Sequence, residues 1–495
     1  MTLNSLIINI GIVALVLTLL TEFVFKARRD WITTFFQNFT GALFIFSGWV
    51  KAIDPLGTAY KMEQYFAEFE YTFQETALSF LAPMFPWLAS FSISFSVFMI
   101  VFEIVLGIAL LVGARPKFTA WAFLLLVGFF TLLTGFTYLT GHVPSGVNFF
   151  EFAQWGDWVE TNMKVTDCGC FGDFLKLKPK VSFFKDIFLL VPAFWFVFRS
   201  GSMHQLFGKP TRTGLLAAGT VGFLIYCLSN YVWDLPHLDF RPFKVGTDIL
   251  AVRQAEQEAQ ANIKVVAYQM TNKQTGEVVE LPYAQFLKEY KSYPKEDWDY
   301  EQIKTKPEIE PTKISDFALT DAEGNDLADE VLNEPNYNFM VVSYKLYGTS
   351  RTQEAKREFP VFSMDTIPDP EMELGYRIER KPSGTEVRTI KETVYNWDDS
   401  FATAYRDLIN PFADAAIEAG FKVYGIAGGA SSSTIDNFRE ATEANYPIYE
   451  ADDILLKTIV RSNPGVVLLK NGKIIMKWHQ NKLPSFAEVQ SEYLK

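Results

Sequence analysis

The sequence has few of the residues on which metal binding, dithiol chemistry and nucleic-acid binding depend. It contains three cysteines and four histidines, and no cysteine follows Cys227. No Walker, dinucleotide-binding or Ser-His-Asp pattern is present. Basic residues are also in the minority, because the formal net charge is -12. A phosphate backbone requires a basic face, so the composition excludes nucleic acid as a partner.

Apolar and charged residues are divided unevenly along the chain. Hydrophobic residues make up 49% of the 495 residues, and 46 of them are Phe. The first 235 residues carry equal numbers of acidic and basic side chains, so the whole net charge of -12 belongs to the remainder. A chain of this length also exceeds the size of a single core, roughly 250 to 300 residues. We therefore expect an apolar part followed by an acidic, soluble part.

The apolar part contains six stretches that are long enough to cross a hydrocarbon core of about 30 Å as helices. They are residues 3–25, 32–53, 89–112, 118–140, 181–198 and 215–233. Lys and Arg follow the first, third and fifth stretches, and basic connections collect on the cytoplasmic side. A cleavable signal carries its basic residues before the apolar stretch, so the first stretch is expected to remain. We predict a protein of the bacterial inner membrane that contacts the lipid bilayer, with both termini and the acidic part in the periplasm.

Two cysteines lie in the external connection between the fourth and fifth stretches. Cys168 and Cys170 are separated by one glycine, which permits closure of a small, labile disulfide ring. They are the candidate catalytic residues, on the oxidising side of the membrane. A static disulfide that pins the loop is one alternative. A metal site with Asp167, Asp173 or His142 is another, but no paired CxxC or HxxxH motif supports it, so we assign neither a metal nor a cofactor.

Three ionisable residues lie in or beside apolar stretches, where such residues are costly and are functional candidates. Lys51 and Asp54 are three residues apart and are expected to pair with each other at a helix end, where Pro55 stops the helix. Glu103 has no partner visible in the sequence. Proton handling and a structural hydrogen bond both remain open for it.

The run of residues 41–61, Glu103 with Gly107, and the Cys-Gly-Cys-Phe-Gly loop together resemble the DoxX/MauE redox-associated membrane proteins. The resemblance covers residues 31–200. It implies a four-helix membrane core, formed by the second to fifth stretches, and a link to thiol oxidation or disulfide delivery. Residue by residue, it gives a chemical role only to Cys168 and Cys170.

The acidic part begins with a linker over residues 236–313 and continues with alternating strands and helices over 314–495. The linker is expected to contain a helix at 248–261 and a hairpin at 264–281, whereas 283–313 predicts no clear fold. Strands are expected at 339–344 and 421–426, with a helix at 401–419 between them. An antiparallel hairpin at 466–469 and 474–478 follows helices at 434–444 and 453–460.

This order of elements, with Asn463-Pro464 before the hairpin, resembles the thioredoxin-like fold. The resemblance implies that Pro464 is the cis-proline beside the active-site loop and that Asn463 offers backbone groups to an extended peptide. The segment after the first strand, residues 345–350, contains no cysteine, so dithiol chemistry by this domain is excluded. An insertion at 351–398 indicates a remodelled binding face.

The predicted protein therefore combines an all-α transmembrane bundle with an α/β thioredoxin-like domain. The bundle consists of an anchor at 1–30, the DoxX-like core at 31–200 and a sixth helix at 201–235. The first functional hypothesis is disulfide exchange through Cys168 and Cys170 with a periplasmic or membrane protein partner, which the C-terminal domain docks. The alternative is a non-enzymatic envelope scaffold or accessory subunit of a membrane or secretion assembly. A proton-coupled carrier that uses Glu103 is a third, weaker possibility.

Overall fold

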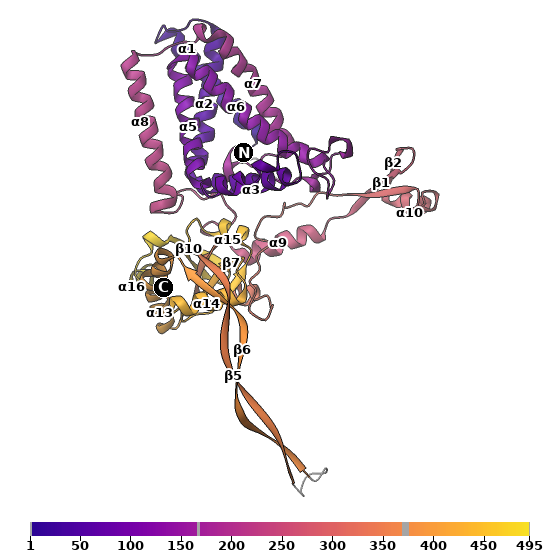
Figure 1. Ribbon diagram of the computed structural model, residues 1–495. Coiled ribbons are helices and arrows are strands. Elements are labelled where there is room, and N and C mark those ends of the chain that lie inside the picture. The colour runs from indigo at the N-terminus through magenta and orange to yellow at the C-terminus, as the bar shows by residue number, and fades with distance from the viewer. Residues whose placement is uncertain (1, 166–168, 369–375, 495) are drawn as a thin grey trace. The chain divides into compact units, whose positions relative to one another are not determined.

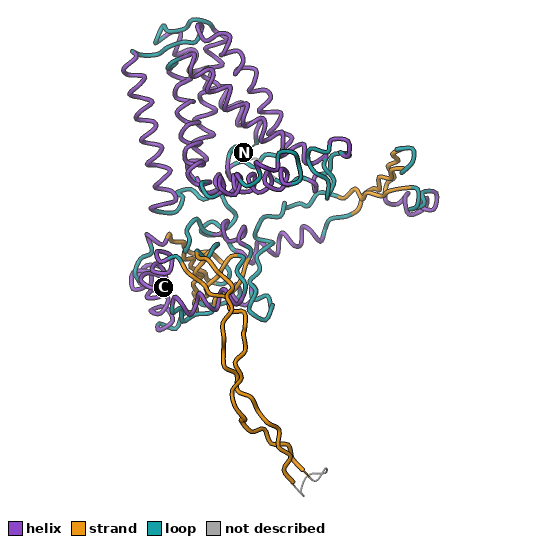
Figure 2. The backbone as a smooth tube through the Cα atoms, viewed as in Figure 1, coloured by secondary structure: helices purple, strands orange, loops and turns teal. Residues whose placement is uncertain are grey.

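The computed structural model describes residues 2–165, 169–368 and 376–494 (Figure 1). The chain divides into two compact units, residues 1–244 and 245–495. The first unit is helical and the second combines helices with β-sheets (Figure 2). This division agrees with the two parts expected from composition and charge.

The first unit contains eight α-helices in its described residues. They are α1 (Leu3–Phe23), α2 (Trp31–Ile53), α3 (Pro55–Gln74), α4 (Met84–Ala89), α5 (Ser92–Val112), α6 (Pro116–Leu139), α7 (Pro179–Arg199) and α8 (Lys209–Leu228). By length and composition, α1, α5, α6, α7 and α8 suffice to cross a membrane. These five helices correspond to five of the six predicted stretches.

The remaining predicted stretch, residues 32–53, is α2, which is also a long helix but is too polar to be counted with the five. It packs against α1, α5 and α7, and its polar side chains find partners on two of these neighbours. The Gln37 amide donates to the Leu110 carbonyl of α5 at 3.1 Å, and the Asn38 amide donates to the Thr18 hydroxyl of α1 at 3.1 Å. Helix α2 therefore has the polarity of a helix that is surrounded by protein rather than by lipid.

Two glycines bring α2 and α5 close together. A Cβ atom added at Gly107 would lie 2.8 Å from the Gly41 carbonyl oxygen, and one added at Gly41 would lie 2.9 Å from the Gly107 carbonyl oxygen. Small residues at a helix crossing allow the backbones to approach and their side chains to interlock. This crossing sets the distance between α2 and α5, and both helices contribute residues to the site described below.

The connection between α2 and α5 is itself helical, which the sequence did not predict. Helix α2 ends at Ile53, and α3 begins at Pro55 in its first turn. The Asp54 carboxylate caps α3 by accepting a hydrogen bond from the Gly57 amide at 3.1 Å. Proline in the first turn and Asp at the N-cap both favour a helix start. Helix α3 lies across one end of the bundle (Figure 1).

The second unit opens with a small three-stranded sheet of order β2-β1-β3, in which all pairs are antiparallel. The elements are α9 (Ile249–Ala261), β1 (Val265–Asn272), β2 (Val278–Pro282), α10 (Tyr283–Glu289) and β3 (Trp298–Lys304). The predicted helix and hairpin are confirmed. Strand β3 corrects the expectation that residues 283–313 have no clear fold.

The core of the second unit is a five-stranded sheet of order β10-β9-β4-β7-β8. Strand β4 is parallel to β7, β7 is parallel to β8, and β9 is antiparallel to both β4 and β10. The strands are β4 (Tyr337–Ser343), β7 (Lys422–Gly428), β8 (Ile448–Ala451), β9 (Gly465–Lys470) and β10 (Lys473–His479). The predicted parallel pair and antiparallel hairpin are confirmed, whereas β8 was not predicted.

Six helices accompany this sheet along the chain. They are α11 (Ala328–Leu332), α12 (Asp399–Ala404), α13 (Asn410–Glu418), α14 (Ser432–Thr442), α15 (Asp453–Ile459) and α16 (Phe486–Tyr493). The predicted helix at 401–419 consists of α12 and α13, joined by a π-helical turn. Phe339, Phe438 and Leu468 are fully buried in the core that the sheet shares with these helices.

The predicted insertion forms one long antiparallel hairpin, β5 (Gly348–Pro368) and β6 (Tyr376–Trp397). With 21 residues in β5 and a rise of about 3.3 Å per residue, the hairpin is roughly 65 to 70 Å long. Most of its described side chains are exposed. It extends away from the five-stranded sheet as a two-stranded ribbon (Figure 1).

Candidate functional site

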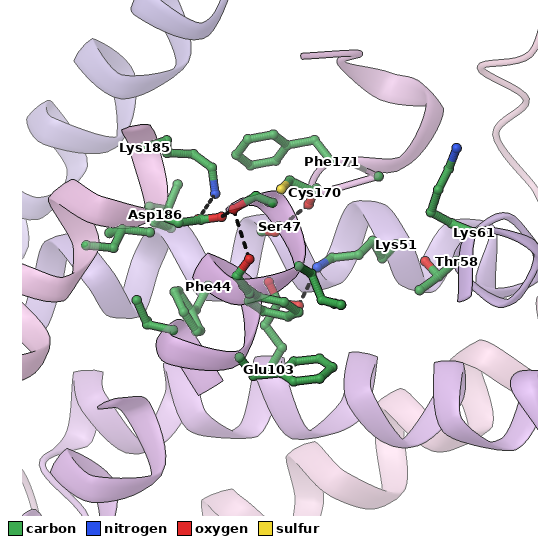
Figure 3. Close-up of a pocket in the computed structure, with 18 of the residues that line it drawn as sticks. Phe44, Ser47, Lys51, Thr58, Lys61, Glu103, Cys170, Phe171, Lys185 and Asp186 are labelled. Carbon is green, nitrogen blue, oxygen red and sulfur yellow. Dashed lines mark hydrogen bonds and ion pairs between the residues drawn. The ribbon is translucent and has the colours of Figure 1, made fainter. Parts of the chain in front are cut away.

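A cavity that several polar and charged side chains line lies inside the helical unit, between α2, α3, α5, α6, α7 and residues 169–171 (Figure 3). Its volume is about 80 Å³, and one water molecule needs roughly 10 to 15 Å³ of such space. The hydroxyl, thiol and charged side chains that line it are Ser47, Lys51, Thr58, Lys61, Tyr65, Glu103, Thr134, Cys170, Lys185 and Asp186. Phe and Leu side chains supply most of the remaining wall, so the polar groups face one another in an apolar setting.

A buried ion pair joins α2 to α5 across the cavity. The Lys51 Nζ lies 2.5 Å from the Glu103 Oε2, and the two side chains are 7% and 3% exposed. The expectation that Lys51 pairs with Asp54 is therefore wrong. Helix α3 starts at Pro55 and uses the Asp54 carboxylate as its cap, whereas the close crossing of α2 and α5 brings Glu103 to Lys51. Glu103, which had no partner visible in the sequence, has one from the neighbouring helix.

A second buried ion pair lies at the start of α7. The Lys185 Nζ is 2.5 Å from the Asp186 Oδ1, and the Asp186 Oδ2 accepts a hydrogen bond from the Thr134 hydroxyl of α6 at 3.0 Å. The Asp186 side chain is 2% exposed. Both carboxylate oxygens therefore have partners, as a buried charge requires. Figure 3 shows Lys185 and Asp186 on the side of the cavity where Cys170 and Phe171 lie.

The cysteine thiol reaches the cavity from the connection between α6 and α7. Cys170 is a free, half-buried cysteine, and its backbone carbonyl accepts a hydrogen bond from the Ser47 hydroxyl of α2 at 2.9 Å. Phe171, fully buried, anchors the same segment in the bundle core. Burial raises the pKa of the Cys170 thiol above its ordinary value, while the positive charge of Lys185 acts in the opposite direction. At neutral pH the thiol is therefore mainly protonated.

The arrangement gives one thiol access to acidic and basic groups in a small space. Each of the two carboxylates that line the cavity is paired with a lysine, since an unpaired buried charge is strongly destabilising. A carboxylate and an ammonium group beside a thiol can exchange protons with it, directly or through water. Cys168, the other predicted catalytic residue, lies outside the described residues.

The remaining predicted site residues lie in the second unit. The Asn463–Pro464 peptide bond is cis, as the resemblance implied for Pro464. The Asn463 Nδ2 donates a hydrogen bond to the Lys345 carbonyl at 2.8 Å. The loop before β9 and the segment after β4 therefore lie side by side, as expected.

Sequence reasoning missed Ser47, Thr134, Lys185 and Asp186. Lys185 and Asp186 fall within the fifth apolar stretch, so the rule that selected Glu103, an ionisable residue in an apolar helix, applies equally to them. Ser47 and Thr134 gave no such signal, because hydroxyl residues are common in helices of this kind. Cys227, expected to be a packing residue, is fully buried on α8 in an apolar cluster with residues of α5.

Within the described residues, no group of three or more His, Cys, Asp and Glu side chains is arranged to hold a metal ion. No protein-family model matches the chain, and neither the curated proteins nor the solved structures include a significant match to it.

Proposed function

We propose that this protein is a membrane-bound thiol-disulfide exchange protein that uses Cys168 and Cys170. The observation that carries the proposal is the position of the Cys170 side chain, in a cavity that also holds two buried ion pairs. A disulfide that only pins a surface loop does not need charged groups inside a helical bundle, and such groups are costly to bury.

In the proposed reaction the Cys168–Cys170 disulfide oxidises a dithiol partner. A thiolate of the partner attacks one sulfur, a mixed disulfide forms, and the second thiolate of the partner releases the reduced pair. Two electrons and two protons pass from the partner to the pair. Lys185 stabilises the Cys170 thiolate as it leaves, and the two protons that the partner thiols release are taken up by the two cysteine sulfurs.

We assign the membrane part to the DoxX/MauE type and the five-stranded domain to the thioredoxin-like type, on the residues and strand order given above. The proposal places Cys168, Cys170 and the C-terminal domain in the periplasm of a bacterial inner membrane, with both termini on that side. It gives the cysteine-free C-terminal domain the task of docking the partner, beside Asn463 and Pro464, where an extended peptide can pair with exposed backbone.

Thiol trapping in intact membranes tests the proposal. Maleimide additions are counted after denaturation, with and without prior reduction, across a graded glutathione buffer, in a Cys227→Ala background. We expect the pair to oxidise and reduce reversibly, and a Cys170→Ser or Cys168→Ser variant to trap a mixed disulfide with a protein partner. A pair that stays oxidised at every ratio of the buffer, and traps nothing, contradicts the proposal.

A second candidate function is a non-enzymatic envelope scaffold, and the β5/β6 hairpin favours it. An isolated two-stranded ribbon is marginally stable in water, so a ribbon of this length is suited to contact another protein. Replacing both Cys168 and Cys170 by Ser separates the two functions. A scaffold keeps its cellular function in this double variant, whereas an exchange protein loses it with its assembly intact.

A further inference from the structure

Three connections of the helical unit meet at the end opposite α3 (Figure 1). The Arg29 Nη1 donates a hydrogen bond to the Gly201 carbonyl at 2.9 Å, and the Leu206 amide donates one to the Val112 carbonyl at 3.0 Å. The connection between α7 and α8 therefore contacts those between α1 and α2 and between α5 and α6. Eight Lys and Arg side chains and one carboxylate belong to these connections and their flanking helix turns, at 24–30, 113–117 and 199–212.

A pocket of about 160 Å³ opens at this basic end, between the starts of α6 and α8. At roughly 10 to 15 Å³ for each water molecule, it has room for about ten of them. The polar and charged side chains that line it are Arg115, Gln205, Lys209, Arg212 and Thr213. Three of these are cations, and no carboxylate lines the pocket among the described residues. The pocket is therefore a site of concentrated positive charge.

The Arg212 guanidinium is held at the pocket by two hydrogen bonds. Its Nη1 donates to the Gly113 carbonyl at 2.9 Å and to the Gln205 side-chain oxygen at 2.8 Å. Glycine is needed at 113, because a Cβ atom there would collide with the His204 carbonyl oxygen. In the part of the chain that the structure describes, both bonds leave from Nη1 and none from Nη2 or Nε. These two nitrogens can therefore donate in parallel to two oxygens of one phosphate group.

Arg115 and Lys209 supply charge at the pocket without a partner of opposite charge. Both side chains are exposed, and within the described residues neither makes a hydrogen bond or an ion pair. Arg115 is the N-cap of α6 and Lys209 is the first residue of α8, and neither helix has a side chain that caps its first amides. Uncapped amides carry the positive partial charge of a helix N-terminus. Two helix starts therefore add to the charge of the three cations.

We propose that this pocket binds a phosphate group, and that the phosphate ties the start of α8 to the start of α6. The Arg212 guanidinium donates to two of its oxygens, and the charges of Arg115 and Lys209 balance it. Without an anion the three cations repel one another. Helix α8 has little else to hold it, because Cys227 is its single buried residue. The inference does not depend on the exchange function, since this pocket and the thiol cavity have no described lining residue in common.

Two sources carry this chemistry, the headgroup of an anionic phospholipid and soluble inorganic phosphate. The pocket lies at the ends of α5, α6 and α8, which are long and apolar enough to cross a membrane. Exposed Phe118 and Leu215 follow it on α6 and α8, where acyl chains would lie. Basic pockets between such helices bind anionic headgroups in other membrane proteins. Both sources present the same phosphate oxygens, so the experiment has one arm for each.

The test uses the full-length protein, delipidated in dodecyl maltoside. Its unfolding temperature is measured against rising dioleoyl phosphatidylglycerol in one arm. In the other arm it is measured against rising sodium phosphate, with sodium chloride holding the ionic strength constant. A ligand that binds the folded protein alone raises this temperature with its concentration, which gives a dissociation constant. In each arm that stabilises the parent, Arg115→Gln and Lys209→Gln should each raise the dissociation constant about fivefold.

Lys117→Gln is the matched control variant. Lys117 is an exposed lysine of α6, two residues from Arg115, and it does not line the pocket. All three variants remove one positive charge from the same end of the unit, so a general loss of surface charge affects them equally. Because the three side chains are exposed, each variant should unfold at the temperature of the parent when no ligand is added. Dioleoylglycerol, which lacks the phosphate, is the control ligand and should not stabilise the parent.

The outcomes distinguish the two sources and can overturn the site. Stabilisation by phosphatidylglycerol that the two pocket variants alone weaken identifies a headgroup site, and the same pattern with sodium phosphate identifies a soluble ion. The proposal is overturned if neither arm stabilises the parent, or if dioleoylglycerol stabilises it as much as phosphatidylglycerol does. It is also overturned if Lys117→Gln weakens binding as much as the pocket variants. Thiol trapping tests the cysteine pair separately, so failure of this site leaves the exchange function unaffected.

Discussion

At the scale of single residues, the proposed exchange chemistry depends on the charges around one thiol. Burial raises the pKa of Cys170, Lys185 lowers it, and Asp186 raises it. The two charged neighbours form an ion pair with each other, so their effects on the thiol largely cancel. Removing one of them exposes the thiol to the other, which makes the pH dependence of Cys170 reactivity a direct readout of the site.

We predict that Lys185→Met slows alkylation of Cys170. Only the thiolate reacts, and the variant removes a positive charge and leaves the negative charge of Asp186 uncompensated, so the pKa rises further. The alkylation rate at pH 8 should fall by about tenfold. The pH range over which this rate rises should also shift to higher pH. In the parent the rate should still be rising at about pH 9, where an unperturbed thiol with a pKa of about 8.5 is mostly ionised.

The measurement is the rate of iodoacetamide modification from pH 6 to 10 in a Cys168→Ser, Cys227→Ala background. Lys180→Met is the matched control, since Lys180 is an exposed lysine of the same helix. The double variant Lys185→Met, Asp186→Asn removes both charges and should return the rate toward that of the parent. Equal rates in Lys185→Met and the parent would show that Lys185 does not act on the thiol.

At the scale of elements, the crossing of α2 and α5 fixes the relative positions of the cavity residues on these two helices. Gly41 and Gly107 are in backbone contact there, and Glu103 lies one turn of α5 away from Gly107. The Lys51–Glu103 pair, at 2.5 Å, therefore depends on how closely the two helices approach. A larger residue at Gly107 meets the Gly41 carbonyl oxygen at 2.8 Å and the Ile45 backbone nitrogen at 3.0 Å, and these backbone atoms cannot move aside as the neighbouring Ile45 side chain can.

We predict that Gly107→Val destabilises the helical unit by about 1 to 3 kcal/mol, the usual cost of overpacking. It should also abolish reversible exchange at the cysteine pair, because separation of α2 from α5 breaks the Lys51–Glu103 contact. Thermal unfolding in detergent and maleimide counting check the two effects. Gly128→Val on α6 is the control, since an added Cβ at Gly128 meets no atom within 4 Å; if it is equally harmful, the crossing is not the cause.

The elements also show how much of the fold could be predicted from the sequence alone. Hydropathy located the five apolar helices, because burial in lipid imposes a continuous apolar run. Helix α2 was predicted at nearly its true bounds. The role of its polar residues could not be predicted, because it depends on their partners on α1 and α5. The pairing of Lys51 with Glu103 depends on contacts between residues far apart in the chain, and spacing along one helix pointed instead to Asp54.

In the second unit, periodicity and turn signals identified β4, β7, β9 and β10, whereas the cis-proline at Pro464 was implied by the resemblance to the thioredoxin-like fold. They missed β8, a strand of four residues, and the pairing of β5 with β6. The strands of that hairpin are mostly exposed, so the alternation of apolar and polar residues that marks a half-buried strand is weak in them. Local sequence signals therefore served best where one face of an element is buried.

At the scale of the whole molecule, one chain joins a membrane-type helical unit to an acidic α/β unit, and each has its own core. The thiol cavity lies entirely within the first unit, whereas the long hairpin belongs to the second. The proposed exchange chemistry and the proposed partner contact therefore belong to different parts of the chain. If this division is correct, removing the hairpin separates the two functions without disturbing either core.

We predict that replacing residues 349–396 by an Asn-Gly turn leaves the five-stranded sheet folded. Gly348 and Trp397 are opposite each other in the ladder, so a two-residue turn can join them. The Trp397 ring packs on Phe438 in the sheet's core, with ring centroids 5.0 Å apart, and is kept. Hydrogen exchange of the β4 and β7 amides in the full-length protein should change by less than about 1 kcal/mol in opening free energy, because the deleted side chains are mostly exposed.

Phe438→Ala is the reference for a damaged core and should cost about 3 to 5 kcal/mol in the same assay. The deletion variant should exchange its Cys168–Cys170 pair with glutathione at the parent rate, since that reaction needs only the helical unit. It should no longer form the mixed disulfide with a protein partner if the hairpin contributes to docking. If the deletion variant still forms the mixed disulfide with its partner, docking uses the sheet domain alone, near Asn463 and Pro464. The hairpin then no longer supports the scaffold function.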